Sequence, residues 1–203
     1  MRRTAAAAAA TRREILDAAL LVFAARGWSG ATLDGIARRA GLTRGAVHHH
    51  FRDKDELLGA VLAEQWARVE PAVLAPLHAG GPPAARLAGF VAGYLERLRT
   101  DPAFRALAVV TTTVAPRSDA AAGLDGKRDG LDGWRAEIRA VLAAAGPLAG
   151  GLDVGHGVFL VMNLLVGATL TVVTHPAAMP AGDATGTVAA AAVAGLFPPE
   201  PTP

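Results

Sequence analysis

Three consecutive histidines, His48, His49 and His50, are the residues that first suggest a metal site. On a helix, successive residues point about 100° apart, so three neighbouring rings diverge and cannot converge on one ion. Cysteine is absent, which excludes disulfides, thiolate metal ligands and cysteine nucleophiles. The sequence therefore predicts no metal and no other cofactor.

Catalytic motifs are also missing. The chain has no G-x-S-x-G nucleophile elbow, no H-E-x-x-H pair and no phosphate-cradling glycine loop. Polar candidates in the C-terminal part, such as His156, are scattered. An enzyme is therefore the least favoured class of function.

The residues just before the histidines have a different chemistry. The hydroxyls of Thr32 and Thr43, with nearby backbone N–H groups, suit a phosphate. Arg44 can bind guanine through two hydrogen bonds or can hold a phosphate, and the sequence leaves both open. Gly45 and Ala46 are small enough for close backbone approach or contact with a thymine methyl. Glycine inside a short helix costs about 1 kcal/mol relative to alanine, which favours a steric reason for Gly45.

The local pattern places these residues on short helices. Thr32 is a predicted N-cap, and Gly41 ends the helix that follows. Thr43 caps a second helix over residues 44–51, and Asp53 with Glu56 forms a capping box for a third. Two short helices around a glycine turn are the helix-turn-helix layout, whose second helix enters the DNA major groove.

The motif T-L-x-x-I-A-x-x-A-G-L-T-R-G-A-V-x-x-H-F-x-x-K-x-E-L-L, from Thr32 to Leu58, resembles the N-terminal domain of the TetR family of transcriptional regulators. Residues 15–27 resemble that family's first helix and its closing glycine. The resemblance covers the first quarter to third of the chain. It departs at His48, where the family usually has an aromatic residue, most often tyrosine.

The resemblance implies a DNA-reading helix, a phosphate-contacting lysine and a histidine, His50, packed beside Phe51. Over phosphates, the rings of His48 and His49 would favour protonation, so binding should strengthen modestly below about pH 6.5. The residues expected to contact DNA are Thr32, Thr43, Arg44, Gly45, Ala46, His48, His49 and Lys54.

The basic residues are concentrated in the N-terminal part, which suits a DNA-binding domain there, although an uneven charge distribution of this size also arises by chance. Residues 1–56 hold ten Arg/Lys and six Asp/Glu, a net charge of +4. The remaining residues hold ten Arg/Lys and twelve Asp/Glu, a net charge of −2. Residues 1–10 are low in complexity and are expected to form a disordered basic arm, with Arg2 and Arg3 free to touch DNA. The N-terminal run mimics a signal peptide, but residues 11–14 interrupt it, so we expect a cytoplasmic protein.

Helical periodicity continues to the end, so the predicted fold is all-α, with about nine helices. We expect a helix-turn-helix domain at 11–56, a helical effector-binding and dimerisation domain at 57–197 and a disordered tail at 198–203. Prolines 71 and 76 are expected to end the helix that starts at Lys54. The further helices are predicted at 11–26, 84–98, 102–114, 134–145, 152–174 and 187–197, with a loop or a frayed helix start at 118–133.

The helix predicted at 152–174 is long and apolar enough to span a bilayer. Asp153, His156 and Asn163, its glycines and the lack of a basic flank argue against a membrane. A soluble helix that is apolar all round must be buried on all sides, and a second copy of the chain is the best cover. The resemblance implies a four-helix dimer interface from the last two helices, which would present two half-sites to a pseudo-palindromic operator. The expected interface residues are Gly155, Gly167, Ala168, Val193 and Leu196.

The C-terminal part carries aromatic side chains at interior spacing, with a few polar groups among them. This composition suits either an ordinary core or a pocket for a small apolar or aromatic effector, and the resemblance implies a pocket. The candidate ligand-binding residues are Trp66, Phe90, Tyr94, Phe104, Thr111, Trp134, Phe159, Met162 and Asn163.

The leading hypothesis is a dimeric repressor that a ligand releases from its operator by changing the spacing of its two DNA-binding heads. The alternative is a DNA-binding regulator without a small-molecule inducer, controlled by a protein partner or by concentration. The sequence leaves repression and activation open. It does not identify the effector or the operator.

Overall fold

The computed structural model describes residues 5–118 and 125–199, which include nine α-helices and no strand. The all-helical prediction is confirmed. Arg2 and Arg3 lie outside the described residues, as does the end of the tail from 200. The helices are α1 (Ala5–Gly30), α2 (Leu33–Arg39), α3 (Arg44–His50), α4 (Lys54–His78), α5 (Pro83–Thr100), α6 (Pro102–Val109), α7 (Asp125–Ala143), α8 (Val154–Thr174) and α9 (Thr185–Ala194).

The alanine run at the N-terminus is helical, which corrects the expected disorder of residues 5–10. Alanine has the highest intrinsic helix propensity, so the run extends α1 backwards without needing tertiary contacts. At its other end α1 is interrupted at Gly27, whose φ of 65° is left-handed and is tolerated best by glycine.

The chain divides into two compact units. One contains residues 1–68 and 106–128, and the other contains 69–105 and 129–203. Helices α4, α6 and α7 each contribute residues to both units. The functional division predicted at residue 56 stays a prediction.

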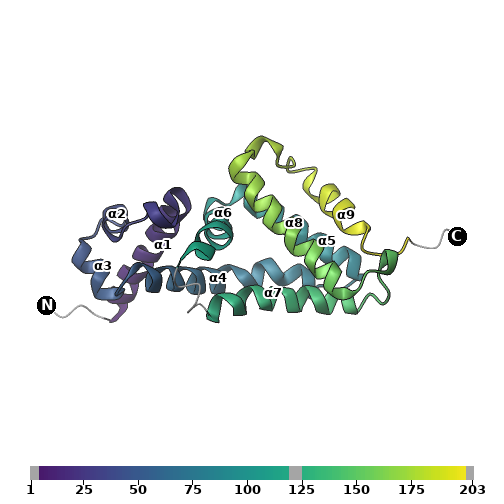
Figure 1. Cartoon of the computed structure of the whole chain (residues 1–203), viewed down its shortest axis with the longest axis horizontal. Coiled ribbons are helices and arrows are strands. Elements are labelled where there is room, and N and C mark those ends of the chain that lie inside the picture. The colour runs from purple at the N-terminus through teal and green to yellow at the C-terminus, as the bar shows by residue number, and fades with distance from the viewer. Residues whose placement is uncertain (1–4, 119–124, 200–203) are drawn as a thin grey trace. The chain divides into compact units, whose positions relative to one another are not determined.

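In the first unit, α1, α2 and α3 pack around a small apolar core (Figure 1). Ile15, Phe23, Ile36, Val47 and Phe51 are almost completely buried in it. The half-buried ring of Trp28 stacks on Phe23 with ring centroids 6.0 Å apart and closes this core.

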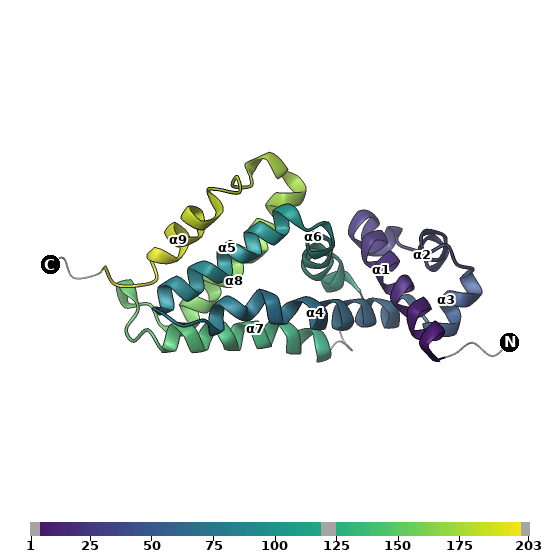
Figure 2. The same cartoon turned by 180° about the vertical axis from the view of Figure 1, so that it is seen from behind.

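In the second unit, α5 packs against both α8 and α9 (Figure 2). Leu87, Phe90, Val91 and Leu98 give α5 a fully buried stripe at helical spacing. The two C-terminal helices are therefore anchored on one helix of their own chain.

Helix α4 continues through Pro71 and Pro76 to His78, so the predicted end at these prolines is wrong. Val73, Leu74 and Leu77 are buried on the inner face, whereas Pro71 is exposed and Pro76 half-buried. Carbonyls that lose their donor to an outward-facing proline can bond water, so packing of the inner face outweighs the cost.

Two other predicted boundaries differ from the structure. The helix expected to reach Val114 changes after Val109 into a π-helix, Val110–Val114, which packs against α1. Helix α7 begins at Asp125, within the segment expected to be a loop. Its glycines lower helix propensity, but they do not prevent a helix whose later residues Trp134, Ile138 and Leu142 are buried.

Candidate nucleic-acid interface and helical body

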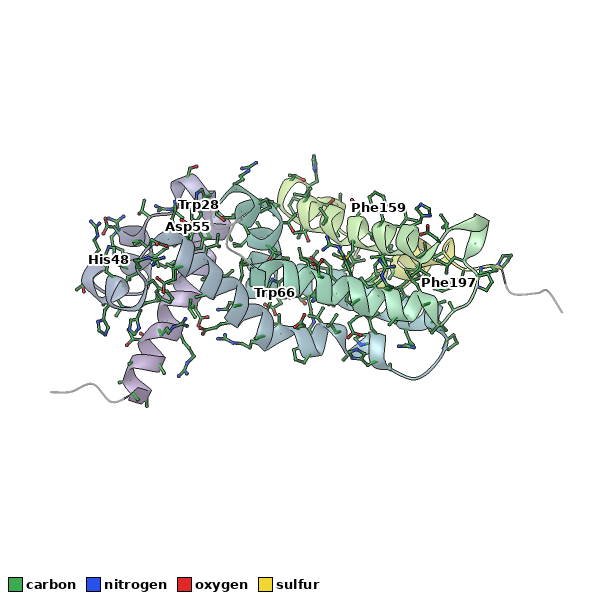
Figure 3. The ribbon with its side chains drawn as sticks, turned by 60° about the horizontal axis from the view of Figure 1, so that its bottom comes forward. Trp28, His48, Asp55, Trp66, Phe159 and Phe197 are labelled. Atoms are coloured by element: carbon green, nitrogen blue, oxygen red, sulfur yellow. The ribbon has the colours of Figure 1, made fainter. Side chains whose placement is uncertain are left out.

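Helix α3 has a buried side and an exposed side. Val47 is fully buried, while Arg44, Gly45, His48 and His49 are exposed. Figure 3 shows His48 at the outside of this helix. The structure thus brings four of the predicted DNA-contacting residues onto one short, solvent-facing segment.

Both predicted threonine caps are present. The hydroxyl of Thr32 accepts a hydrogen bond from Gly35 N at 3.1 Å, and that of Thr43 accepts one from Ala46 N at 3.2 Å. Each cap satisfies a backbone donor in the first turn of its helix. Gly41, with a φ of 69°, makes the turn between the two helices in the left-handed conformation expected of it.

Arg44 is held by two neighbours. Its Nε–H donates to Nε2 of His48, 3.2 Å away and one turn further along α3. Oδ1 of Asp34, on α2, lies 3.5 Å from the same Nε. Sequence reasoning missed Asp34, which lies in the first turn of α2, nine residues before the cap of α3.

The start of α4 is fixed by a capping arrangement close to the one predicted. Asp53 accepts from Glu56 N at 2.8 Å, and Glu56 accepts from Arg52 N at 2.8 Å, one residue before the predicted partner. The backbone bond from Glu56 and the Arg52 guanidinium together lower the pKa of Asp53. The carboxylate is thus kept charged at the positive end of the helix.

Lys54 has a role in the fold that sequence reasoning missed. Its ammonium donates to the carbonyls of Trp28 and Ala31 at 2.7 and 3.2 Å and lies 4.0 Å from the centre of the Trp28 ring. It therefore ties the start of α4 to the end of α1. The phosphate contact predicted for Lys54 stays a prediction, and these bonds compete with it.

Residues 15–61 match the family model described as bacterial regulatory proteins, tetR family. This segment holds the whole helix-turn-helix and the start of α4. Residues 15–61 are therefore a helix-turn-helix domain of the tetR family of transcriptional regulators. Members of this family are regulators and not enzymes.

Two curated members of the tetR family illustrate how far the sequence likeness extends. The HTH-type transcriptional regulator SrpR of Pseudomonas putida is 62% identical over 64 residues, 32% of this chain and 30% of SrpR. The regulator BetI of Escherichia coli is 37% identical over 94 residues, 45% of this chain and 48% of BetI. The chain thus matches less than half the length of these relatives.

Solved structures extend the likeness of fold to the whole chain. FadR of Bacillus subtilis, determined in complex with stearoyl-CoA, is 21% identical with a TM-score of 0.73, over 91% of this chain and 99% of FadR. AibR, determined with isovaleryl coenzyme A and operator DNA, is 19% identical with a TM-score of 0.74, over 93% of this chain and 99% of AibR. At these identities the comparison establishes the tetR-like fold alone.

Four of the predicted ligand-binding residues form one aromatic cluster in the second unit. Phe90 and Tyr94 each meet the Trp134 ring edge-on, at 5.6 and 6.0 Å between centroids, and Tyr94 meets Phe104 at 5.3 Å. All four side chains are buried. The structure therefore brings together residues from α5, α6 and α7.

Polar groups accompany this cluster, and sequence reasoning missed two of them. The Tyr94 hydroxyl lies 2.7 Å from Oγ1 of Thr169 on α8, and Trp134 Nε1 donates to Glu70 at 2.9 Å. Burial raises the pKa of Tyr94 to about 12, partly opposed by the bond to Thr169. Tyr94 is thus a neutral hydroxyl at physiological pH.

The other predicted ligand-binding residues lie elsewhere. Trp66 donates to Thr111 at 2.9 Å within the first unit, and Met162 is buried on α8. Phe159, with 64% of its surface exposed, lies on the outside of α8 (Figure 3), and Asn163 is exposed one turn further along. The expected interior position of Phe159 is wrong, because this residue lies on the opposite side of α8 from the buried Val161 and Leu165.

The exposed residues of α8 form a continuous apolar stripe, which we call the outer face. Its members follow the alternating four- and three-residue spacing of a helix–helix contact: Phe159, Asn163, Val166, Leu170 and Val173. Gly155 and Gly167 are exposed beside it, and a Cβ added at Gly167 would meet nothing within 4 Å. Ala168 is half-buried.

Val193 and Leu196 are buried within their own chain, which corrects their expected exposure to a partner. They line a groove of about 270 Å³ between α8 and the end of α9, together with Leu160 and Leu164. The cause is the close packing of α9 on α5, which turns Val193 inward.

By length and composition α8 could cross a membrane, and 39% of its most apolar stretch is buried within the described structure. Its inner side is occupied by this chain's own core, through residues such as Val161, Leu165 and Thr169. The outer face is the part of α8 that this chain leaves most exposed.

Proposed function

We propose that this protein is a cytoplasmic, sequence-specific DNA-binding repressor that acts as a homodimer and places α3 in the major groove. The observation that supports this most is the two-sided character of α3. Val47 anchors the helix in the core, and the groups that face solvent, Arg44, Gly45, His48 and His49, suit base edges and phosphates.

The homodimer is supported by the outer face of α8. Exposed apolar side chains at helix-packing spacing are typical of a surface that pairs with another helix. A second copy supplies a matching helix by two-fold symmetry and doubles the DNA contacts. The operator is then a pseudo-palindrome with half-site centres about 34–36 Å apart.

A small apolar or aromatic effector is proposed for the region of the aromatic cluster. Tyr94 with Thr169, and Trp134 with Glu70, place two polar pairs beside buried aromatic rings. The structures of FadR and AibR, which contain acyl-CoA molecules, make acyl-CoAs the first compounds to test. Helix α4 has residues in both units and is the element through which ligand binding would change the spacing of the DNA-binding heads.

DNA binding is tested with a duplex from immediately upstream of the gene, measured by fluorescence anisotropy across a salt series. We expect tight binding by the wild type and a loss of about ten- to a hundredfold in Arg44→Ala, from a base contact of about 1–3 kcal/mol. Arg139→Ala, an exposed arginine of α7, is the matched control. Weak binding that is equal on random duplex and unchanged in Arg44→Ala would contradict the proposal.

Repression and ligand response need separate measurements. Transcription in vitro from the same upstream DNA should fall when the protein is added, whereas a rise would identify an activator. An effector should raise the melting temperature of the dimer and weaken its DNA binding. If neither acyl-CoAs nor aromatic compounds do so, a regulator controlled by a protein partner or by concentration is favoured.

A further inference from the structure

The contacts of Arg44 use only one edge of its guanidinium. His48 and Asp34 both meet the Nε edge, at 3.2 and 3.5 Å, one from α3 itself and one from α2. Within residues 5–118 and 125–199, no hydrogen bond is made by Nη1 or Nη2 of Arg44. The Arg44 side chain is 65% exposed, so these two terminal nitrogens face solvent with their donors available.

We propose that Arg44 reads a guanine in each half-site through Nη1 and Nη2, with His48 and Asp34 as positioning residues. This inference rests on the proposed DNA-binding function and names the base that the surface selects. Guanine presents two acceptors, O6 and N7, in the major groove, and the paired donors of an arginine match them. An arginine whose Nε edge is already held loses less conformational freedom on binding than a free one.

The position of Asp34 decides between a base and a phosphate as the partner of Arg44. A phosphate that approached this guanidinium would also meet the negative charge of Asp34, 3.5 Å from Nε. The edge of a guanine is uncharged and carries only acceptors, so Asp34 repels it much less. The two partners that the sequence left open are therefore not equivalent, and guanine is favoured.

The contact with His48 depends on protonation. Nε2 accepts a hydrogen bond only in the neutral ring with its proton on Nδ1. A proton on Nε2 would replace this bond by repulsion between two cations. The charged or titratable groups around His48 are Arg44 and His49 on α3 and Asp34 on α2. The neutral ring of His48 with its proton on Nδ1 is therefore the form that holds Arg44.

The test selects preferred duplexes from a random pool with the full-length wild type, then replaces each base pair in turn and measures relative affinity. We expect one guanine per half-site whose replacement weakens binding about ten- to a hundredfold. Arg44→Lys keeps the charge but lacks the rigid planar fork of a guanidinium, so the guanine preference should weaken while binding to random duplex stays within a few-fold of wild type.

His48 and Asp34 are tested by matched pairs of variants. His48→Gln retains an acceptor and should keep the guanine preference, whereas His48→Phe has no acceptor and should lose most of it. Asp34→Asn should bind random duplex more tightly and discriminate less. All of these residues are exposed, and equal melting temperatures will confirm that the variants are folded.

Different failures have different meanings. If Arg44→Ala weakens binding to all duplexes equally, Arg44 contacts a phosphate and the inference is wrong, while the regulator proposal stands. If His48→Phe and Asp34→Asn discriminate like the wild type, neither is a positioning residue. If the wild type selects no sequence at all, the proposed function itself fails.

Discussion

The outward side of α3 and the outer face of α8 are both exposed, but they leave different groups in contact with solvent. On α3 the exposed groups are polar, and most of them already have a partner within the chain, as Thr43 and Arg44 do. On α8 they are apolar, from Phe159 to Val173, with Asn163 bonded back to the Phe159 carbonyl. The first surface is stable in water, whereas the second leaves apolar area in water that burial would remove.

This difference indicates two kinds of partner. The surface of α3, with its oriented hydrogen-bond donors beside a charged group, suits a ligand that can be bound and released, such as operator DNA. A stripe of apolar residues at helix-packing spacing suits a permanent partner, because the apolar side chains stay out of water only while the partner remains bound. Substitutions on the two surfaces should therefore differ in kind: on α8 they change assembly, and on α3 they change recognition.

The largest effect is expected from a charge on the outer face of α8. Leu170→Arg would bury an unpaired charge in the proposed interface, at a cost of about 3–5 kcal/mol. Sedimentation velocity at micromolar concentration should find a dimer for the wild type and a monomer for the variant, and operator affinity should fall at least a hundredfold. Ala136→Arg, at an exposed position of α7, is the control and should remain dimeric. A dimeric Leu170→Arg variant would place the interface elsewhere.

The inner side of α8 gives the next largest effect, through Tyr94 and its bond to Thr169. Burial raises the pKa of Tyr94 from its ordinary value of 10 to about 12. Because the folded value is the higher one, the neutral hydroxyl stabilises the fold fully below pH 10. That contribution, about 2–3 kcal/mol, is lost as the pH rises from 10 through 12.

Tyr94 is the only tyrosine in the chain, so its titration can be followed directly by phenolate absorbance. We expect a midpoint well above 10 for the folded protein and an ordinary midpoint in denaturant. Tyr94→Phe should cost about 1 kcal/mol at pH 7 and should lose less stability than the wild type between pH 10 and 12. An ordinary midpoint in the folded protein would mean that the hydroxyl reaches solvent.

A smaller effect is expected at Lys54, which tests whether a residue near the DNA-binding surface serves the fold. Lys54→Met keeps the aliphatic stem over Trp28 and removes the ammonium from two carbonyls. The free energy of unfolding should fall by about 2 kcal/mol. The salt dependence of operator binding should stay unchanged. A slope reduced by about 1.8, from one phosphate contact in each half of the dimer, with unaltered stability would show instead that Lys54 contacts a phosphate.

The sequence predicted the local structure of the first unit well, because its signals are local. Thr32, Gly41 and Thr43 each act within one helical turn, so their types and spacing determine caps and turns directly. The contacts of Arg44 with Asp34 and of Lys54 with Trp28 were not predictable in the same way. They join residues on different helices, whose meeting depends on how the helices pack.

The same distinction explains the errors in the C-terminal part. A period of 3.6 residues separates two faces of α8, but α8 is apolar on both, so the sequence did not indicate which face was inside. Phe159 was therefore expected in the interior and is exposed, whereas Val193 was expected at a partner and is buried. Pro71 was expected to end a helix that tertiary packing continues.

The smallest effect, and the one that separates folding from recognition on α3, is expected at Thr43. Thr43→Ala removes the acceptor for Ala46 N and should cost about 1 kcal/mol of stability, whereas Thr43→Asp keeps a good cap and should leave stability close to wild type. On DNA the order reverses, because an aspartate at the exposed start of α3 repels phosphates. Thr43→Asp should therefore bind the operator more weakly than Thr43→Ala, in anisotropy titrations at a temperature where both are folded. If the two variants rank alike in stability and in binding, Thr43 acts only through the helix, and the start of α3 does not face the DNA backbone.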